Sequence, residues 1–272
     1  MNQNPLANMP PVVKNILIIC VLAFMGTWVM DKQLGFDVSQ MLGLSYFSSD
    51  NFEPYQFVTH IFMHADFTHL LFNMFAFWMF GRILEQVWGS KRFFIYFIVT
   101  GLGAAILHTF VQWIEFAPIQ KAVQLYIQNP NVNDFEALVT DHFPRYYSQV
   151  YMKNIKLWSE DPNNTLYIQQ SIEFANDLLN FKLSTVTVGA SGAVFGVLLA
   201  FGMLFPNTEL MLLFPPIPIK AKYFVIGYGA LELYLGFANN ADDNVAHFAH
   251  LGGMLFGFIL IKLWQKDKKR FY

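Results

Sequence analysis

The stretch GASGAVFGVLLAFGMLF, residues 189–205, has no charged side chain and places Ser191 among small and large apolar residues. Counted from Leu183, the stretch is long enough to cross a bilayer, because a spanning helix needs about 20 mostly apolar residues. The whole chain of 272 residues is 55% hydrophobic and 13% charged, whereas about a quarter of the residues in a soluble domain are charged. This composition predicts a membrane protein and excludes a disordered or collagen-like chain.

Six stretches qualify as membrane spans, although the fifth is short. They are roughly Pro11–Met30, Phe57–Phe80, Phe93–Ile114, Leu183–Phe205, Tyr223–Ala238 and Val245–Trp264. Apolar spans of this kind satisfy their backbone polar groups within helices. We therefore predict an all-α membrane protein built as a bundle of six transmembrane helices. Its single cysteine cannot form a disulfide within the chain, and its net charge of −2 gives no general attraction to nucleic acid.

The charges beside the spans predict the orientation of the bundle. One set of short flanks is basic and holds Lys14, Arg82, Lys91, Arg92, Lys220, Lys222, Lys262, Lys266, Lys268, Lys269 and Arg270. The opposite flanks hold Lys32 as their only base, beside Asp31, Asp37, Asp50, Glu53, Asp242 and Asp243. Because basic flanks stay in the cytoplasm, we expect an integral multi-pass protein with both termini cytoplasmic.

Two segments are not expected to span. Residues 31–56 are rich in Phe, Leu and Tyr but are interrupted by Gly, Ser and Pro54, which indicates an interfacial loop with short helices. Residues 115–182 form a long insert with a helical apolar spacing from Thr165 to Leu183. We expect residues 1–272 to form a single membrane domain, with this helical insert on the outer side. There it either caps the mouth of the site or has no role.

Polar groups inside a span are costly, so each is a candidate site residue. The second, fourth and sixth stretches hold most of them near their outer ends, namely His60, His64, Asp66, His69 and Asn73, then Ser184, Thr185, Thr187 and Ser191, then His247 and His250. At about 1.5 Å per residue, Ser191 and His250 both lie on the order of 10 Å below the outer surface. The remaining His108 and Glu232 are expected to be satisfied between helices.

This set of side chains suits nucleophilic catalysis. A serine beside a neutral imidazole can be deprotonated as it attacks a carbonyl carbon, without a third member. His69 and Asn73 are four residues apart, so they share one helix face and can direct two N–H groups at a developing oxyanion. The Ser191 amide can add a third donor.

Glycines predict how closely the helices approach. Gly192-Ala-Val-Phe-Gly196 and Gly253-Met-Leu-Phe-Gly257 are small-xxx-small motifs, which allow close contact between helices in lipid. Such contact would bring His250 within hydrogen-bonding reach of Ser191. Phe195, one turn further along the helix from Ser191, is expected to stack on the imidazole.

Together these motifs resemble the rhomboid intramembrane serine proteases. The resemblance rests on Gly189-Ala-Ser-Gly192, on Ala249-His-Leu-Gly-Gly253, and on the spacing of His60, His64, His69 and Asn73. It covers the six-span core and excludes the insert. It implies a six-helix rhomboid-like bundle in which Ser191 is the nucleophile, His250 the general base, and His69 and Asn73 oxyanion donors.

The resemblance further implies hydrolysis of peptide bonds in or next to transmembrane segments, without metal or ATP. We expect such a protein in a bacterial cytoplasmic (inner) membrane, with transmembrane proteins as its substrates. The chain departs from the family in two places. Tyr55-Gln56 stands where the outer loop often has Trp-Arg, and the Gly-Gly-x-x-Glu pattern reads Gly81-Arg82-Ile-Leu-Glu85.

Alternatives remain open on the sequence alone. His247, one turn from His250, is a competing base, and His60 with His64 allows a metal site, although no HExxH motif is present. The whole protein can also be read as a proton-coupled transporter that uses His69, Glu232 and His250, or as a non-catalytic rhomboid-like protein that binds membrane clients.

Overall fold

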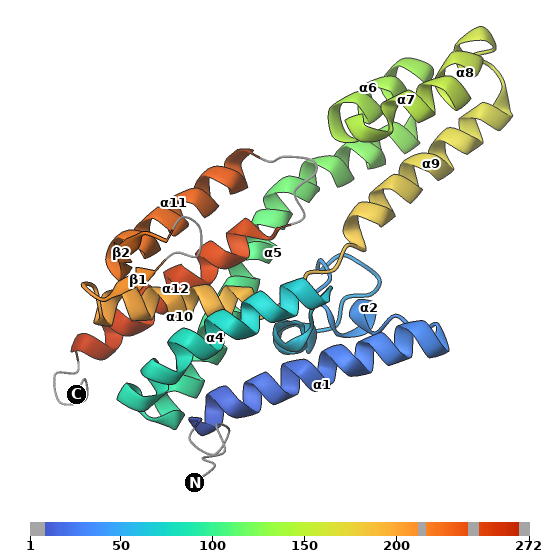
Figure 1. Ribbon diagram of the computed structural model, residues 1–272. Helices are drawn as coiled ribbons and strands as arrows, with labels where there is room; N and C mark the ends of the chain where they lie inside the picture. The colour runs from blue at the N-terminus through green and yellow to red at the C-terminus, as the bar shows by residue number, and fades with distance from the viewer. Residues whose placement is uncertain (1–8, 212–215, 239–244, 267–272) are drawn as a thin grey trace. The chain divides into compact units, whose positions relative to one another are not determined.

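The computed structural model describes residues 9–211, 216–238 and 245–266, and it is mostly helical, as the sequence predicted (Figure 1). Some residues used in the charge count lie outside these described ranges, namely Asp242, Asp243, Lys268, Lys269 and Arg270.

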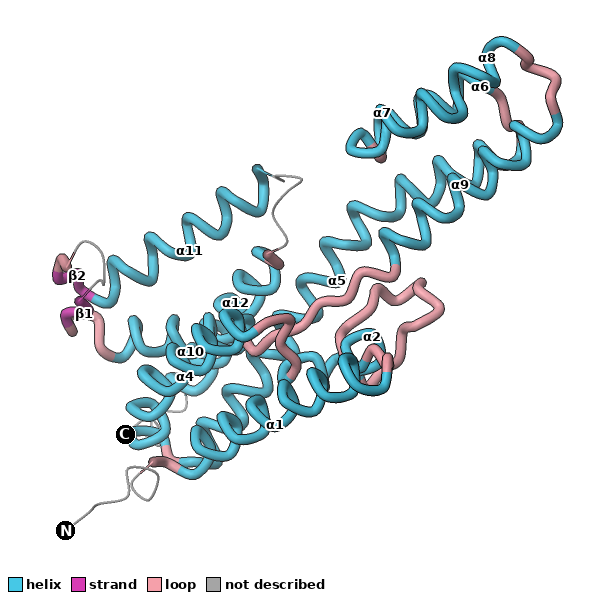
Figure 2. The backbone as a smooth tube through the Cα atoms, turned by 45° about the vertical axis from the view of Figure 1, so that its right-hand side comes forward, coloured by secondary structure: helices cyan, strands magenta, loops and turns pink. Residues whose placement is uncertain are grey.

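The helices and strands follow one another along the chain as α1 (Pro11–Leu34), α2 (Val38–Leu42), α3 (Gln56–Thr59), η1 (His60–Phe62), α4 (Phe67–Trp88), α5 (Ser90–Gln128), α6 (Val132–His142), η2 (Pro144–Tyr146), α7 (Tyr147–Val150), the π-helical η3 (Tyr151–Ile155), α8 (Lys156–Glu160), α9 (Thr165–Leu183), α10 (Ser191–Leu204), β1 (Glu209–Met211), β2 (Pro218–Lys220), α11 (Ala221–Ala238) and α12 (His247–Lys266). The two short strands pair antiparallel, and β2 runs directly into α11 (Figure 2).

The chain divides into two compact units. The first comprises the described residues up to Ser45, Asn51–Thr109 and those from Val186 onward, and the second comprises Tyr46–Asp50 and Phe110–Thr185. The first unit contains α1, α4, α10, α11, α12 and the first half of α5. The whole of the predicted insert, 115–182, lies in the second unit.

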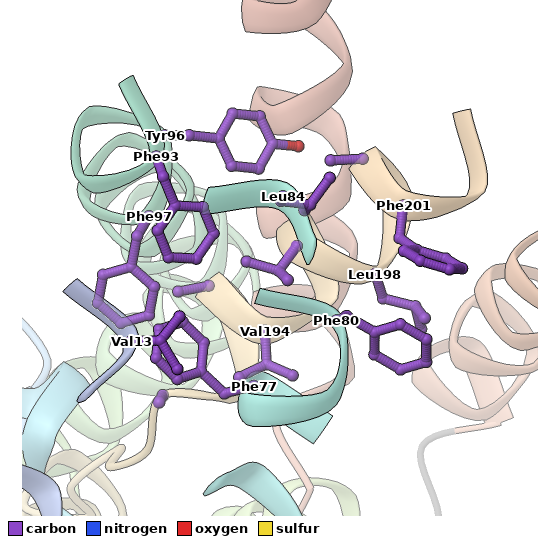
Figure 3. Close-up of a cluster of buried hydrophobic side chains, with 14 of the residues drawn as sticks. Val13, Phe77, Phe80, Leu84, Phe93, Tyr96, Phe97, Val194, Leu198 and Phe201 are labelled. Carbon is purple, nitrogen blue, oxygen red and sulfur yellow. The ribbon is translucent and has the colours of Figure 1, made fainter. Parts of the chain in front are cut away.

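Helix α10 is the centre of the first unit. It packs against α4, α11 and α12, and 10 of its 14 residues are buried. A helix that is apolar all round is stable where protein or lipid, and not water, surrounds it. Figure 3 shows this core, in which Val194, Leu198 and Phe201 of α10 lie among aromatic and aliphatic side chains of α1, α4 and α5.

Four helices of the described residues are long and apolar enough to cross a membrane: α1, α4, α5 and α12. Helix α10 is apolar but has only 14 residues. The all-α membrane fold is therefore confirmed, while the count of six spans stays a prediction.

Two predicted helices begin later than expected. The stretch predicted to span from Phe57 instead forms α3, η1 and a turn, and α4 begins at Phe67 because the Asp66 carboxylate accepts a hydrogen bond from the His69 amide at 2.8 Å. The stretch predicted over Leu183–Phe205 is also broken. Helix α9 ends at Leu183, and α10 begins only at Ser191. His60, His64, Ser184, Thr185 and Thr187 consequently lie in connecting segments and not in spanning helices.

The second unit has a helical core of its own. The helix predicted to end near Ile114 continues as α5 to Gln128, and the helix predicted from Thr165 to Leu183 is confirmed as α9. Buried side chains of α5, α6, α8 and α9 form this core, including Val123, Phe135, Val139, Trp158 and Ala175. The Tyr126 hydroxyl hydrogen-bonds with Ser171 inside it. The insert is thus a packed helical structure.

A carboxylate from α4 caps the first helix. The two oxygens of Glu85 accept hydrogen bonds from the backbone amides of Val12 and Val13, at 2.9 and 2.8 Å, and Ser90 donates a third at 2.7 Å. Residue Pro10 at the start of α1 supplies no side-chain cap. Glu85 therefore satisfies amides that would otherwise be orphaned at the positive end of the helix dipole.

We expect Glu85→Ala to lower the free energy of unfolding by about 1–3 kcal/mol, because two buried amides lose their acceptor. Thermal unfolding of the purified protein in detergent measures this change. Glu209→Ala, at an exposed position of β1, is the control and should shift stability by less than about 0.5 kcal/mol. Equal melting temperatures for the two variants would contradict the capping role.

Candidate active site

Ser191 is the first residue of α10, and the segment before it is held from two sides. Thr187 exchanges a pair of backbone hydrogen bonds with Leu44, both 2.9 Å long, and the Gly189 amide donates to the His60 carbonyl at 2.9 Å. Gly189 has a φ of +127°, which side chains other than glycine rarely adopt. A Cβ there would also lie 2.8 Å from the His69 ring. Gly189 thus lets the chain turn into α10 directly against His69.

The loop that contains Leu44 is itself anchored by the Tyr55-Gln56 pair. The Gln56 amide is fully buried, accepts a hydrogen bond from the Ser45 amide at 3.1 Å, and donates to the carbonyls of Met41 and Asn51 at 3.2 and 2.9 Å. The Tyr55 hydroxyl donates to the same Met41 carbonyl at 3.2 Å. These two residues, which depart from the family's Trp-Arg pattern, therefore cross-link the loop in this chain.

The structure brings Ser191 and His250 together. Ser191 Oγ and His250 Nε2 lie 2.8 Å apart, which is hydrogen-bonding distance. A small-residue contact allows this approach, because a Cβ on Gly253 would lie 1.8 Å from the Gly192 carbonyl oxygen. The prediction that the two glycine motifs meet is confirmed for these first glycines. The second glycines, Gly196 and Gly257, instead face Thr100 and Tyr96 of α5.

Phe195 fixes the plane of the His250 ring, as the sequence predicted. The two rings stack with their centroids 4.1 Å apart and their planes 8° from parallel. Tyr228 of α11 packs against the same phenylalanine at 4.9 Å. The His250 side chain is 10% exposed, so the orientation of its ring is set almost entirely by protein neighbours.

Glu232 of α11 is the residue whose place in the site the sequence analysis missed. Its Oε2 accepts hydrogen bonds from Nδ1 of His250 at 2.8 Å and from Nδ1 of His247 at 2.6 Å. From the sequence, Glu232 was expected to be satisfied between helices, or to join His69 and His250 in the transporter alternative, but not to contact the catalytic imidazole of a protease. The available signal was one acidic residue in an apolar helix, together with two histidines three residues apart in the next one.

The same three side chains are the group best placed to hold a metal ion among the described residues, since one ligand atom from each lies within 4.8 Å of the others. Two ligands about 2.0–2.1 Å from a tetrahedral ion lie on the order of 3.3 Å apart. The 2.6 and 2.8 Å separations are shorter than that and match charge-assisted hydrogen bonds. The geometry therefore favours a carboxylate shared by two imidazoles.

His69 and Asn73 lie on α4, one turn apart. The His69 ring packs under Gly189, two residues before Ser191. The Asn73 side chain is buried and donates to the His69 carbonyl at 3.0 Å, so it is bonded along its own helix and not to Ser191. One of its two amide hydrogens remains for another acceptor.

The other histidines have separate places. His60 Nδ1 bonds the Gln56 carbonyl at 2.8 Å, and His108 Nε2 bonds the Thr187 hydroxyl at 2.9 Å, so both brace the segments beside the site. His64 is buried with its ring 5.2 Å from that of His69 in an edge-on arrangement. Within the described part of the chain, neither ring nitrogen of His64 has a hydrogen-bond partner.

Comparison with known proteins identifies the family of this chain. The rhomboid domain matches residues 51–114 and 163–266, which is more than half of the chain and leaves residues 115–162, the first part of the insert, unmatched. The chain is similar to the protein named rhomboid protease GlpG from Haemophilus influenzae, with 23% identity over 111 residues, covering 40% of this chain and 55% of that protein.

Two other relatives carry the same name. The GlpG protein of Klebsiella pneumoniae is 32% identical over 107 residues, covering 39% of this chain and 36% of the relative. The GlpG protein of Salmonella choleraesuis is 30% identical over 92 residues, covering 34% of this chain and 32% of the relative. The chain thus aligns with only a third to about half of the length of these relatives. The extent of the rhomboid domain match establishes that this integral membrane protein belongs to the rhomboid family.

Proposed function

We propose that this chain is an intramembrane serine endopeptidase that cleaves peptide bonds in or next to transmembrane segments of membrane proteins. The observation that carries the proposal is the 2.8 Å contact between Ser191 Oγ and His250 Nε2, at the start of an apolar helix. The relatives named as rhomboid proteases support it. We place the protein in a bacterial cytoplasmic membrane with both termini cytoplasmic.

The reaction follows from the roles of these groups. Ser191 Oγ attacks the carbonyl carbon of the scissile bond while its proton moves to His250 Nε2. The oxyanion that forms accepts hydrogen bonds from His69, Asn73 and the Ser191 amide. His250 then gives the proton to the leaving amine, and a water molecule hydrolyses the acyl-serine by the same steps.

A fluorophosphonate or isocoumarin probe tests the proposal directly, because only an activated serine reacts with it. The purified wild-type protein should become labelled and should cleave a reconstituted single-span model substrate, and Ser191→Ala should do neither. Labelling that survives in Ser191→Ala would refute the assignment of the nucleophile. A wild-type chain that binds clients but neither labels nor cleaves would instead be the client-binding alternative.

The helical insert gives a further prediction. Phe116, near the start of the insert, and Leu183, directly after its end, belong to one buried cluster with Tyr46, so a short linker can join Ile114 to Leu183. We expect replacement of residues 115–182 by a Gly/Ser linker to preserve probe labelling of Ser191, because the insert has its own core. Cleavage should persist but change in rate or substrate choice. Unchanged kinetics over several substrates would show that the insert has no role in cleavage, and lost labelling would show that the first unit needs it.

A further inference from the structure

Glu232 is an acidic side chain in an apolar helix, only 4% exposed. A carboxylate at such a position is costly unless charged or hydrogen-bonding partners compensate it. Both of its partners are imidazoles on one face of α12, His247 and His250. One of these two imidazoles also contacts Ser191, which connects the carboxylate to the candidate nucleophile through a single ring.

We propose that Glu232 is a positioning residue for His250, which extends the serine–histidine pair to a hydrogen-bonded chain of Ser191, His250 and Glu232. This inference rests on the proposed protease function. It goes beyond the pair expected from the sequence, in which the imidazole acts without a third member.

The first step of the argument concerns the tautomer. An ionised carboxylate only accepts hydrogen bonds, so His250 Nδ1, 2.8 Å from Oε2, carries the ring hydrogen. The lone pair then lies on Nε2, which faces Ser191 Oγ. This tautomer is the one that can remove the serine proton. The opposite tautomer would donate a hydrogen toward Ser191 and could not act as a base.

The second step concerns charge. When the serine proton moves to Nε2, the ring becomes a cation, and the nearby carboxylate stabilises it while keeping its own negative charge. Attraction between such charges is stronger in a buried site than in water. His247 donates a second hydrogen bond to the same oxygen at 2.6 Å and thereby holds the carboxylate in place. Tyr228, one turn before Glu232 on α11, packs against Phe195, the ring that stacks on His250.

A purely structural role is the competing explanation, since Glu232 also ties α11 to α12. The two roles differ in what they change. A residue that only links the two helices affects the amount of folded protein. A positioning residue also affects the rate of the chemical step in the folded protein and the tautomer of His250. Measurements normalised to folded protein therefore separate them.

The test uses Glu232→Gln in the full-length protein. The glutamine side chain has nearly the same shape but no charge, and its NH₂ group can force the wrong tautomer. We expect kcat and the probe-labelling rate to fall by about 10²–10⁴-fold, with KM little changed. Glu232→Asp, which keeps the charge, should recover part of the rate. Nitrogen NMR of histidine-labelled protein, assigned with His250→Ala, should show the hydrogen on Nδ1 in the wild type and its loss from Nδ1 in Glu232→Gln.

Glu85→Gln is the matched control, because Glu85 is also a buried glutamate but caps α1 away from Ser191. It should lose stability and keep the labelling rate of the folded protein. Wild-type rates in Glu232→Gln, or losses no larger than in Glu85→Gln, would overturn the positioning role while leaving the protease assignment intact. If the wild type neither labels nor cleaves, the protease assignment fails, and the NMR comparison still decides whether Glu232 sets the tautomer.

Discussion

His250→Ala is expected to abolish cleavage of a model transmembrane substrate, with a loss on the order of 10⁴–10⁶-fold, while His247→Ala keeps activity within about tenfold of the wild type. The reason is geometric. His250 Nε2 lies 2.8 Å from Ser191 Oγ, whereas His247 reaches the site through Glu232. Without the imidazole, no group in contact with the serine accepts its proton, and removal of one member of such a pair costs nearly as much as removal of both.

His247→Ala is the matched control for this experiment. His247 lies on the same helix as His250, is similarly buried, and donates to the same Glu232 oxygen. Effects that come only from lost packing, or from a lost hydrogen bond to Glu232, should therefore appear in both variants. Probe labelling of Ser191 and substrate cleavage should both be measured, each per folded molecule. An inactive His247→Ala beside an active His250→Ala would reverse the assignment of the base.

The pairing of Ser191 with His250 was accessible from the sequence because three local signals agree. The glycines of the two helices predict a close approach, the apolar runs predict a shared depth, and Phe195 lies one turn from the serine. The glycine and Phe195 signals depend on helical periodicity, which a membrane enforces strongly. The structure accordingly places the Phe195 ring on His250 at 4.1 Å. The depth of Ser191 was counted along a helix from Leu183 that the structure does not form, since α10 begins only at Ser191.

The place of Glu232 in the site was not accessible in the same way. Its partners lie 15 and 18 residues further along the chain, beyond a connection whose geometry the sequence does not determine. A polar residue in a span indicates a site but not which neighbour it faces. Deciding that His247 and His250 both face Glu232 required the packing of α11 against α12.

The errors in helix boundaries have one physical cause. Residues 57–66 and 184–190 are apolar enough to be counted into spans, yet the first stretch forms only the short helices α3 and η1 followed by a turn, and the second is irregular. They satisfy their backbone groups partly through contacts distant in the sequence, such as the Gly189 amide on the His60 carbonyl and the Thr187 pairing with Leu44. Irregular backbone is tolerated at membrane depth where it is buried in protein, and hydropathy alone does not detect such long-range partners.

Asn73→Ala is expected to lower kcat by about 10²–10³-fold, or on the order of 3–4 kcal/mol, with little change in KM. In the free protein the Asn73 amide donates to the His69 carbonyl at 3.0 Å, which orients the group and leaves its second hydrogen for an oxyanion. The hydrogen bond from Asn73 to the oxyanion strengthens as negative charge develops on that oxygen. Its loss therefore affects the transition state more than substrate binding. His69→Ala should show the same pattern, and the remaining Ser191 amide can make both losses smaller.

Asn176→Ala provides the matched control for this last experiment. The Asn176 amide donates to the Ile172 carbonyl at 3.0 Å, the same bond four residues back that Asn73 makes, but on α9 in the second unit. It should therefore reproduce the small effect of losing this bond on helix stability and leave kcat unchanged. If Asn73→Ala raises KM at constant kcat, Asn73 binds substrate and does not stabilise the oxyanion. If it behaves like Asn176→Ala in both parameters, the α4 amide takes no part in the reaction, and the oxyanion depends on His69 and the Ser191 amide.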